Sequence, residues 1–250
     1  MKYLFANGDS HTSGNELEYA GQIDCYEKAW PNQLAKKLNL TNINIAKAGA
    51  SNYRIFRTTQ DWVIENVVLN KKYKPSELIM FVMWSGFDRE EIYFPDTKVI
   101  DDVGFSSTTN LFNTGLQKEL KIFQNSFAVF QDNLVSCFHS LSLTYNLSLF
   151  LDSLKIKHYF INGLYNFMDL NGSDTNHPLY GPYDNLLKVY NDKIKNHTGF
   201  HNKEEMYFNY MQANSGIEIP KHSKYSHYGE DGHIFWANRV YDIYFNKKLI

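Results

Sequence analysis

The first fourteen residues read MKYLFANGDSHTSG, and they are the most informative stretch of the chain. The apolar run at 3–6 breaks abruptly into Gly8-Asp9-Ser10, with further small and polar residues behind it. Such a break is typical of a buried strand that ends in a tight turn. Ligands of open parallel sheets bind at the carboxyl ends of the strands, so Ser10 is a candidate nucleophile. The tripeptide by itself is also a common turn, and the rest of the chain has to decide between the two.

The composition predicts one globular domain. The chain has 250 residues, 43% of them hydrophobic and 16% aromatic, which is enough to bury a large core. A formal charge of −2 argues against a dedicated nucleic-acid binder. We find neither a secretory signal nor an unbroken apolar run of the ~20 residues that span a bilayer. We therefore expect a cytoplasmic protein without a membrane or nucleic-acid partner, with Cys25 and Cys137 as buried thiols, and the oligomeric state stays open.

Strand-like and helix-like segments alternate over the first ninety residues, which predicts an α/β fold with a mostly parallel sheet and right-handed crossovers. The expected strands are 3–6, 42–46 and 78–84, and the expected helices are 30–38 and 52–68. Further on we expect a long loop at 95–114, one long helix or two joined ones at 116–154, a strand at 158–162, a second long loop at 163–184, and helices at 186–194 and 234–245. No repeat or linker divides residues 1–250, so a single domain is predicted.

Two segments follow predicted strands and bring polar groups to the same sheet edge as Ser10. Residues 44–52 read NIAKAGASN, and Gly49 would let a backbone N–H approach a substrate oxygen closely. The same glycine also suits an ordinary strand-to-helix turn. Residues 83–90 read MWSGFDRE and offer another donor, although the charged end of this run also fits a solvated salt-bridge cluster.

A third segment, SHYGEDGHIFWA at 226–237, carries two histidines ahead of an apolar helix. An imidazole beside a serine hydroxyl takes its proton during attack, which makes the serine nucleophilic near neutral pH. His227 is the candidate base. His233 enters the apolar helix, and we expect it to be structural.

With these segments in order, the chain resembles the SGNH (GDSL-type) hydrolases. Gly8-Asp9-Ser10 resembles the first block of that family, 44–52 resembles the second, and the segment around His227 resembles the last, which reads roughly D-x-x-H-P before a helix. The resemblance implies a flavodoxin-like three-layer α/β/α fold and Ser-His-Asp chemistry without a metal or other cofactor. It implies that Ser10 is the nucleophile and His227 the base, with oxyanion donors at the N–H groups of Ser10 and Gly49.

The chain departs from the family pattern in two places. The family acid lies three residues before the histidine, where this chain has Lys224. A Ser-His dyad, a backbone carbonyl or another acid (Asp231 or Glu230) could replace it, or the site could be weak or inactive; a rival register would pair Asp231 with His233. The family's oxyanion asparagine corresponds to Phe87, and we expect the Ser85 hydroxyl to act instead.

These observations predict a serine esterase acting through an acyl-enzyme, with an O-acetylated carbohydrate as the preferred substrate class. Asp9, Asn52 and Trp84 are expected to contact the substrate. Sugar stacking would use the aromatic-rich loop residues Tyr165, Phe167, His177, Tyr180 and Tyr183, which also suit ordinary loop packing. The alternative is an inactive glycan-binding or structural module of the same fold, virion-associated if the chain is of phage origin. Neither a G-x-G-x-x-G nor a Walker motif follows a strand, which argues against a nucleotide binder. The histidines lack the spacing of metal ligands, so we predict no metal site.

Overall fold

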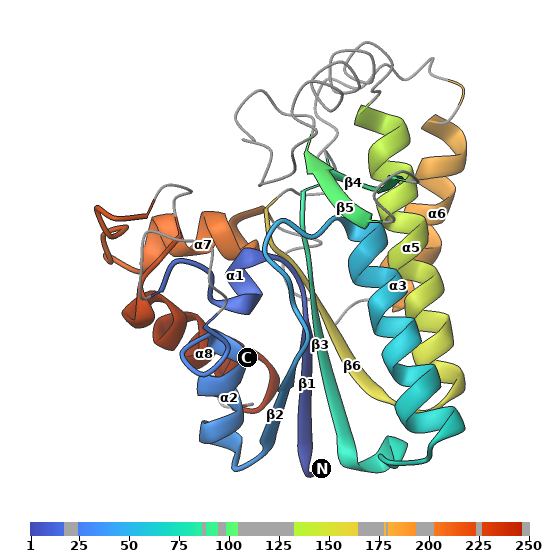
Figure 1. The fold of residues 1–250 in the computed structure, drawn as a ribbon. Coiled ribbons are helices and arrows are strands. Elements are labelled where there is room, and N and C mark those ends of the chain that lie inside the picture. Colours follow the sequence, from blue (N-terminus) through green and yellow to red (C-terminus); the bar gives the residue numbers. More distant parts are fainter. Residues whose placement is uncertain are drawn as a thin grey trace.

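Strands β1 (Tyr3–Asn7), β2 (Thr41–Asn44), β3 (Leu78–Trp84) and β6 (Lys157–Asn162) form a parallel sheet in the order β2-β1-β3-β6 (Figure 1). The structure is a computed structural model and describes residues 1–17, 25–86, 89–94, 99–104, 133–164, 178, 180–193, 203–223 and 227–246. β1 pairs with β2 on one side and with β3 on the other, so the chain reverses the direction of sheet growth at β1. Such a switch point is where open α/β sheets form a ligand crevice, at the carboxyl ends of the strands.

Helices cover both faces of this sheet and complete a three-layer α/β/α fold. One face carries α2 (Trp30–Leu38), α7 (Tyr207–Asn214) and α8 (Glu230–Tyr244), and the other carries α3 (Asn52–Val63), α5 (Asn133–Ser153) and α6 (Tyr180–Lys193) (Figure 1). The smaller elements are α1 (Ser10–Ser13), a π-helical turn at Ile64–Leu69, and 3-10 turns at Pro75–Glu77 and Lys203–Glu205. The predicted fold class is confirmed.

The apolar run of β3 explains why both faces need covering. All seven of its residues are buried, and they alternate between two cores because successive strand side chains point to opposite faces. Met80, Val82 and Trp84 pack with α3 and α5, whereas Phe81 and Met83 pack with α2, α7 and α8. A strand with one wet face would show polar residues at every second position, and this one shows none.

Helix α5 lies against the core. Leu134–Ser153 is long and apolar enough to cross a membrane by length and composition alone, with a mean hydropathy of 1.3. Its Leu134, Cys137, Leu141 and Leu147 side chains are buried in the cluster beside the sheet. A helix that is apolar on most sides is expected where a helix packs between the sheet and a further helix, here α6.

Several expected boundaries differ from the structure. Residues 99–104 belong to β5 (Val99–Gly104), which pairs antiparallel with β4 (Arg89–Phe94), so the expected loop at 95–114 is wrong there. Asp101 and Asp102 in mid-strand hid this pairing, because aspartate is disfavoured in strands and the partner strand supplies the stabilising contacts. α6 begins at Tyr180, inside the expected loop 163–184, and α7 was not predicted. Parts of these segments lie outside the described residues: 95–98 and 105–114 of the first loop, 165–177 and 179 of the second, and 116–132 of the expected long helix.

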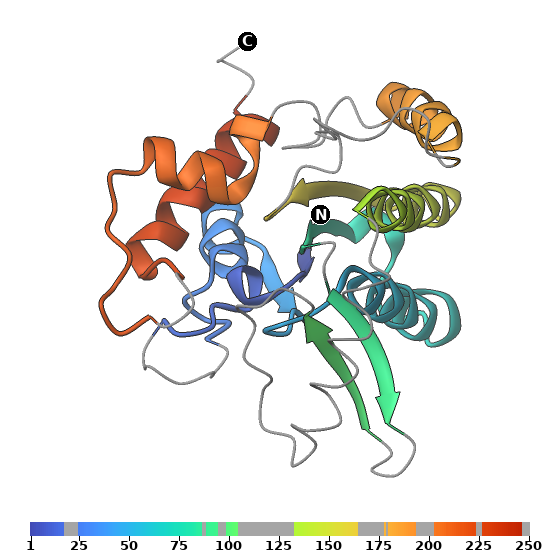
Figure 2. The same ribbon diagram turned by 90° about the horizontal axis from the view of Figure 1, so that it is seen from above.

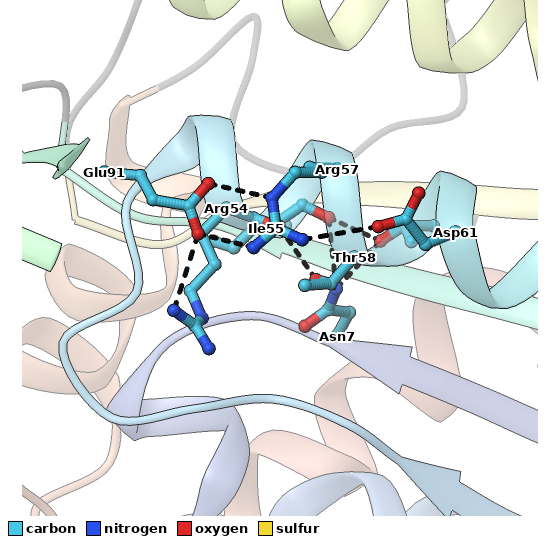
Figure 3. A network of polar contacts seen from close by, with 8 residues as sticks. Asn7, Arg54, Ile55, Arg57, Thr58, Asp61 and Glu91 are labelled. Carbon is cyan, nitrogen blue, oxygen red and sulfur yellow. Dashed lines mark hydrogen bonds and ion pairs between the residues drawn. The ribbon is translucent and has the colours of Figure 1, made fainter. Parts of the chain in front are cut away.

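The β4–β5 hairpin lies beside α3, apart from the main sheet (Figure 2). Figure 3 shows how α3 is held on both sides. From β1, Asn7 Nδ2 donates to Ile55 O at 3.1 Å and to Thr58 Oγ1 at 2.9 Å. From β4, the Glu91 carboxylate, with only 4% of its side chain exposed, accepts two hydrogen bonds from Arg57, at 2.9 Å from Nε and 2.5 Å from Nη2. Such a two-pronged pair fixes orientation as well as position.

Replacing Glu91 by alanine should therefore destabilise the protein. Arg57 loses a charge-assisted pair that is mostly shielded from water, and we expect the free energy of unfolding to fall by about 1–3 kcal/mol in urea titrations. The matched control is Asp61→Ala, because Asp61 is paired with the same arginine at 3.3 Å but has 64% of its side chain exposed. Its removal should change stability by about 0.5 kcal/mol or less. Equal losses in the two variants would contradict the prediction.

Candidate active site

The turn after β1 is closely packed and presents Ser10 at the start of α1. A Cβ at Gly8 would collide with Thr12 Oγ1 and reach Met83 O, so only glycine fits there. The Asp9 side chain caps α1 by accepting a hydrogen bond from the His11 N–H at 3.0 Å. A short helix therefore begins at the serine itself, at the carboxyl end of the first strand.

The Ser10 hydroxyl meets His227 across 217 positions of sequence. Ser10 Oγ lies 2.8 Å from His227 Nε2. Both residues are nearly buried, with 7% and 6% of their surfaces exposed. This is the distance at which an imidazole can take the proton of a hydroxyl.

Glu16 contacts the other nitrogen of the same ring. Its Oε2 lies 3.1 Å from His227 Nδ1, and Glu16 is 3% exposed. Ser223 joins the two, since its hydroxyl donates to Glu16 Oε2 at 2.8 Å and accepts from the His227 backbone N–H at 2.8 Å. Serine, histidine and carboxylate thus form a continuous chain of contacts, an arrangement in which a carboxylate orients the ring and stabilises any positive charge that forms on it.

Glu16 is held in an uncommon backbone conformation. Its φ is 63°, in the left-handed region that costs a non-glycine residue on the order of 1–3 kcal/mol. His222 contributes to holding it, because His222 Nε2 lies 3.1 Å from Glu16 O. Backbone strain of this kind persists where the surrounding structure enforces it and is concentrated at functional sites.

Burial sets the charge state of His227. Loss of hydration lowers the pKa of His227 below its ordinary value, and the nearby carboxylates of Asp9 and Glu16 oppose this only in part. The ring is therefore mostly neutral at pH 7 and able to accept a proton.

Two further histidines pack close by and serve the structure. The His11 ring stands edge-on to His227 with centroids 4.8 Å apart, and burial holds its pKa well below the usual range. His233 Nδ1 accepts a hydrogen bond from the Trp30 N–H at 2.9 Å, and burial lowers its pKa to about 3. A neutral His233 thus caps the first turn of α2, in agreement with the structural role expected for it.

A second polar network lies beneath the turn. Ser85 Oγ donates to Asp9 Oδ2 at 3.1 Å and accepts from Arg89 Nη1 at 2.8 Å. Arg89 Nη1 itself lies 3.6 Å from Asp9 Oδ2. The negative charge of Asp9, with 1% of its side chain exposed, is thus paired with the Arg89 guanidinium beside Ser10.

Five of the expected site residues are placed differently from the prediction. Asp231 lies exposed in the first turn of α8, and the described carboxylate at the His227 ring is Glu16, so the expected acid is corrected. Trp84 is fully buried in the sheet core and cannot touch a substrate. The Ser85 hydroxyl proton is already donated to Asp9, and Asn52 is occupied by the Ser85 backbone, whose N–H it accepts at 2.8 Å. Asp9 is shielded within its own turn, so its contacts are structural.

The loop after β2 lies against the serine turn. Lys47 N donates to Gly8 O at 3.1 Å, and Asn44 Nδ2 donates to Thr12 O at 2.8 Å. Gly49 follows with a φ of 80°, a conformation that favours glycine. Lys224, Phe87, Tyr165, Phe167 and His177 lie outside the described residues, and the side chain of Tyr183 is also not described. Tyr180 packs against the core of α5.

Reasoning from sequence missed Glu16, Ser223 and Arg89. The search for an acid was confined to the segment around the histidine, where the family pattern places it. The available signal was an acidic residue six positions after the candidate nucleophile, in the same loop. Among the described residues, no three histidine, cysteine or acidic side chains gather to hold a metal ion.

The comparisons with known proteins identify the fold. The model of a family of unknown function, DUF6071, matches residues 14–107. No curated protein sequence matches the chain. A solved structure named TesA superposes with a TM-score of 0.51 at 10% identity, covering 98% of this chain and 99% of its own.

Two other solved structures match at lower TM-scores. A protein from Desulfitobacterium hafniense, described as lipolytic and of the G-D-S-L family, has 7% identity and a TM-score of 0.47, with 97% of this chain and 99% of its own covered. The acetyl xylan esterase AlAXEase has 12% identity and a TM-score of 0.47, with 97% and 99% covered. At these identities the likeness concerns the fold alone: this chain has a three-layer α/β/α fold that superposes on TesA.

Proposed function

We propose that this protein is a serine ester hydrolase of the SGNH type. The observation that carries the proposal is the chain of contacts from Ser10 Oγ through His227 to Glu16, at 2.8 and 3.1 Å. The three residues come from the turn after β1 and from the segment before α8, and nothing in the stability of the fold requires a buried carboxylate and imidazole to line up on a serine hydroxyl. The alternative of an inactive module rested on Lys224 at the acid position and on Phe87 in place of the oxyanion asparagine, and the Glu16 carboxylate beside His227 counters the first of these.

The proposed reaction has two halves. Ser10 Oγ attacks the ester carbonyl while His227 Nε2 takes the hydroxyl proton, and Glu16 stabilises the resulting imidazolium. The imidazolium then protonates the leaving alcohol as its C–O bond breaks, which leaves an acyl-Ser10. Water, deprotonated by the same ring, attacks the acyl carbon and releases the carboxylic acid and free serine.

Backbone amides are proposed to stabilise the tetrahedral oxyanion. Ser10 opens α1, and the N–H groups of a first helical turn have no acceptor within the helix. The N–H of Gly49 is proposed as the second donor, because its loop is bonded to the serine turn. Donors fixed by the backbone are pre-oriented and cost no reorganisation during reaction.

A small acyl group on a carbohydrate is the proposed substrate, in particular O-acetyl. Support for the acyl part is the small exposed fraction of the nucleophile, 7%, beside the equally enclosed His227 ring. Support for the carbohydrate part is the aromatic content of residues 163–184 in the sequence.

A covalent probe tests the proposed chemistry directly. A fluorophosphonate should label the folded protein at Ser10, detected by mass spectrometry of the peptide that contains it. Heat-unfolded protein should not react, because the hydroxyl then lacks its base. Labelling that survives unfolding, or that falls on other serines, would overturn the proposal.

The rate should follow the protonation of His227. Protonated His227 cannot accept the serine proton, so kcat/KM for p-nitrophenyl acetate should rise with pH and then level off. Because burial lowers the pKa of His227, the midpoint is expected below 6.5. Initial rates between pH 4.5 and 8 locate the midpoint. A midpoint well above 6.5 would mean that the base is more exposed than in the structure.

A further inference from the structure

A cavity of about 270 Å³ opens between α3, α5 and the start of β4. Arg89 lines it from β4, Tyr53 from α3, and Ser136, His139, Ser140 and Ser142 from α5. Its volume is slightly below the ~300 Å³ at which pockets for small organic ligands begin, so it suits one ring-sized group. The cavity has no part in the proposed reaction steps.

Arg89 connects the cavity to the serine turn. Its Nη1 bonds to Ser85 Oγ at 2.8 Å and lies 3.6 Å from the carboxylate of Asp9, the residue before Ser10. A guanidinium carries five N–H donors, and within the described part of the chain only Nη1 makes a hydrogen bond. Arg89 also lines the cavity, and 16% of its side chain is exposed.

The lining favours a negatively charged group. None of the described residues that line the cavity carries a carboxylate, and among them Arg89 is the one with a permanent charge. Ser140 Oγ accepts a hydrogen bond from Asn52 Nδ2 at 3.1 Å, which leaves its own proton to donate. Two acids in the described part of the chain lie near Arg89 and are already paired: Asp9 lies 3.6 Å from Arg89, and Glu91 pairs with Arg54 and Arg57. A carboxylate matches the two-pronged geometry of the remaining guanidinium donors.

We propose that this cavity is a subsite for a carboxylate on the alcohol half of the ester, as borne by a uronate sugar, with Arg89 as its binding residue. This proposal rests on the proposed esterase function in one respect, namely that the ligand is an ester. Binding of the carboxylate itself does not require turnover. Tyr53, half exposed at 49%, offers an aromatic face for the ring that carries the charge.

Binding to the intact protein is the first test. The probes are methyl glucuronoside and methyl glucoside, which differ by a carboxylate in place of a CH₂OH group, titrated by calorimetry or NMR. The glucuronoside should bind at least about 10-fold more tightly, and Arg89→Gln should abolish the difference. Arg239→Gln is the matched control, because Arg239 lies on α8 across the sheet and packs over Tyr210. Ser136→Phe, which fills the cavity without removing charge, should also abolish binding.

Hydrolysis gives the second test. The substrates are 4-acetoxybenzoate and its methyl ester, which share the acetyl group and differ in one charge on the leaving phenol. The kcat/KM value for 4-acetoxybenzoate divided by that for its methyl ester should fall about 10-fold or more in Arg89→Gln relative to the wild type. Arg89→Lys should retain part of the preference for the charged substrate. Comparing ratios removes the intrinsic difference in reactivity between the two esters.

The outcomes separate this proposal from the esterase function. Arg89-dependent uronoside binding without ester hydrolysis supports the subsite and counts against the esterase. Hydrolysis with equal binding of the two sugars and a ratio unaffected by Arg89→Gln overturns the subsite and leaves the esterase standing. Loss of the preference in Arg239→Gln as well would overturn the assignment to this cavity.

Discussion

Ser10→Ala and His227→Ala should each lower kcat for p-nitrophenyl acetate by about 10³–10⁶-fold. The first variant removes the attacking oxygen, and the second removes the base 2.8 Å from it. Residues that act as one unit are not additive, so the double variant should be little slower than either single one. Stopped-flow and steady-state release of p-nitrophenol measure both the acylation burst and the turnover.

The matched control is Ser153→Ala. Ser153 ends α5, with its hydroxyl bonded to Phe150 O at 2.7 Å, and takes no part in the site. Its rate should equal that of the wild type. Melting temperatures equal to that of the wild type would show that the losses in rate are chemical and not losses of folding. Free imidazole should restore part of the rate of His227→Ala. Full activity in Ser10→Ala would remove the proposed mechanism altogether.

Glu16→Gln should lower kcat by about 10²–10⁴-fold while leaving KM for a small ester nearly unchanged. Glutamine keeps the shape but loses the charge that stabilises the imidazolium, and its NH₂ group can favour the unproductive ring tautomer. Because the Glu16 carboxylate raises the pKa of His227, its removal should also move the acid limb of the pH–rate profile to lower pH. A slower enzyme whose midpoint falls cannot be explained by loss of stability alone.

Asp231→Asn is the matched control for Glu16. Both substitutions remove the charge of a carboxylate. Asp231 follows His227 closely in sequence but is exposed on α8, whereas Glu16 is 3% exposed and contacts the His227 ring. Asp231→Asn should change neither kcat nor the midpoint. A fall in kcat with Asp231→Asn and none with Glu16→Gln would reverse the assignment of the acid.

Elements that depend on local pattern were predictable from sequence. The apolar run of β3 and the proline-started helix α2 have the boundaries that their sequences indicate. The β4–β5 hairpin was not predictable, because β5 carries two aspartates in mid-strand and is stabilised by a partner strand. Helix α7 was not predicted either. Long-range pairing leaves little trace in a window of ten residues.

For the site, the serine turn, the histidine before the last helix and the alternation of strands and helices that brings strand ends to one edge were predictable from the sequence. These follow from short motifs whose backbone geometry is local, such as the glycine that only fits at position 8. Only the tertiary structure showed that Glu16 is the carboxylate at the imidazole, because this assignment depends on the distance between the two groups in the folded protein. Glu16 and His227 are 211 positions apart, and their contact exists only once the sheet has brought β1 beside the segment before α8.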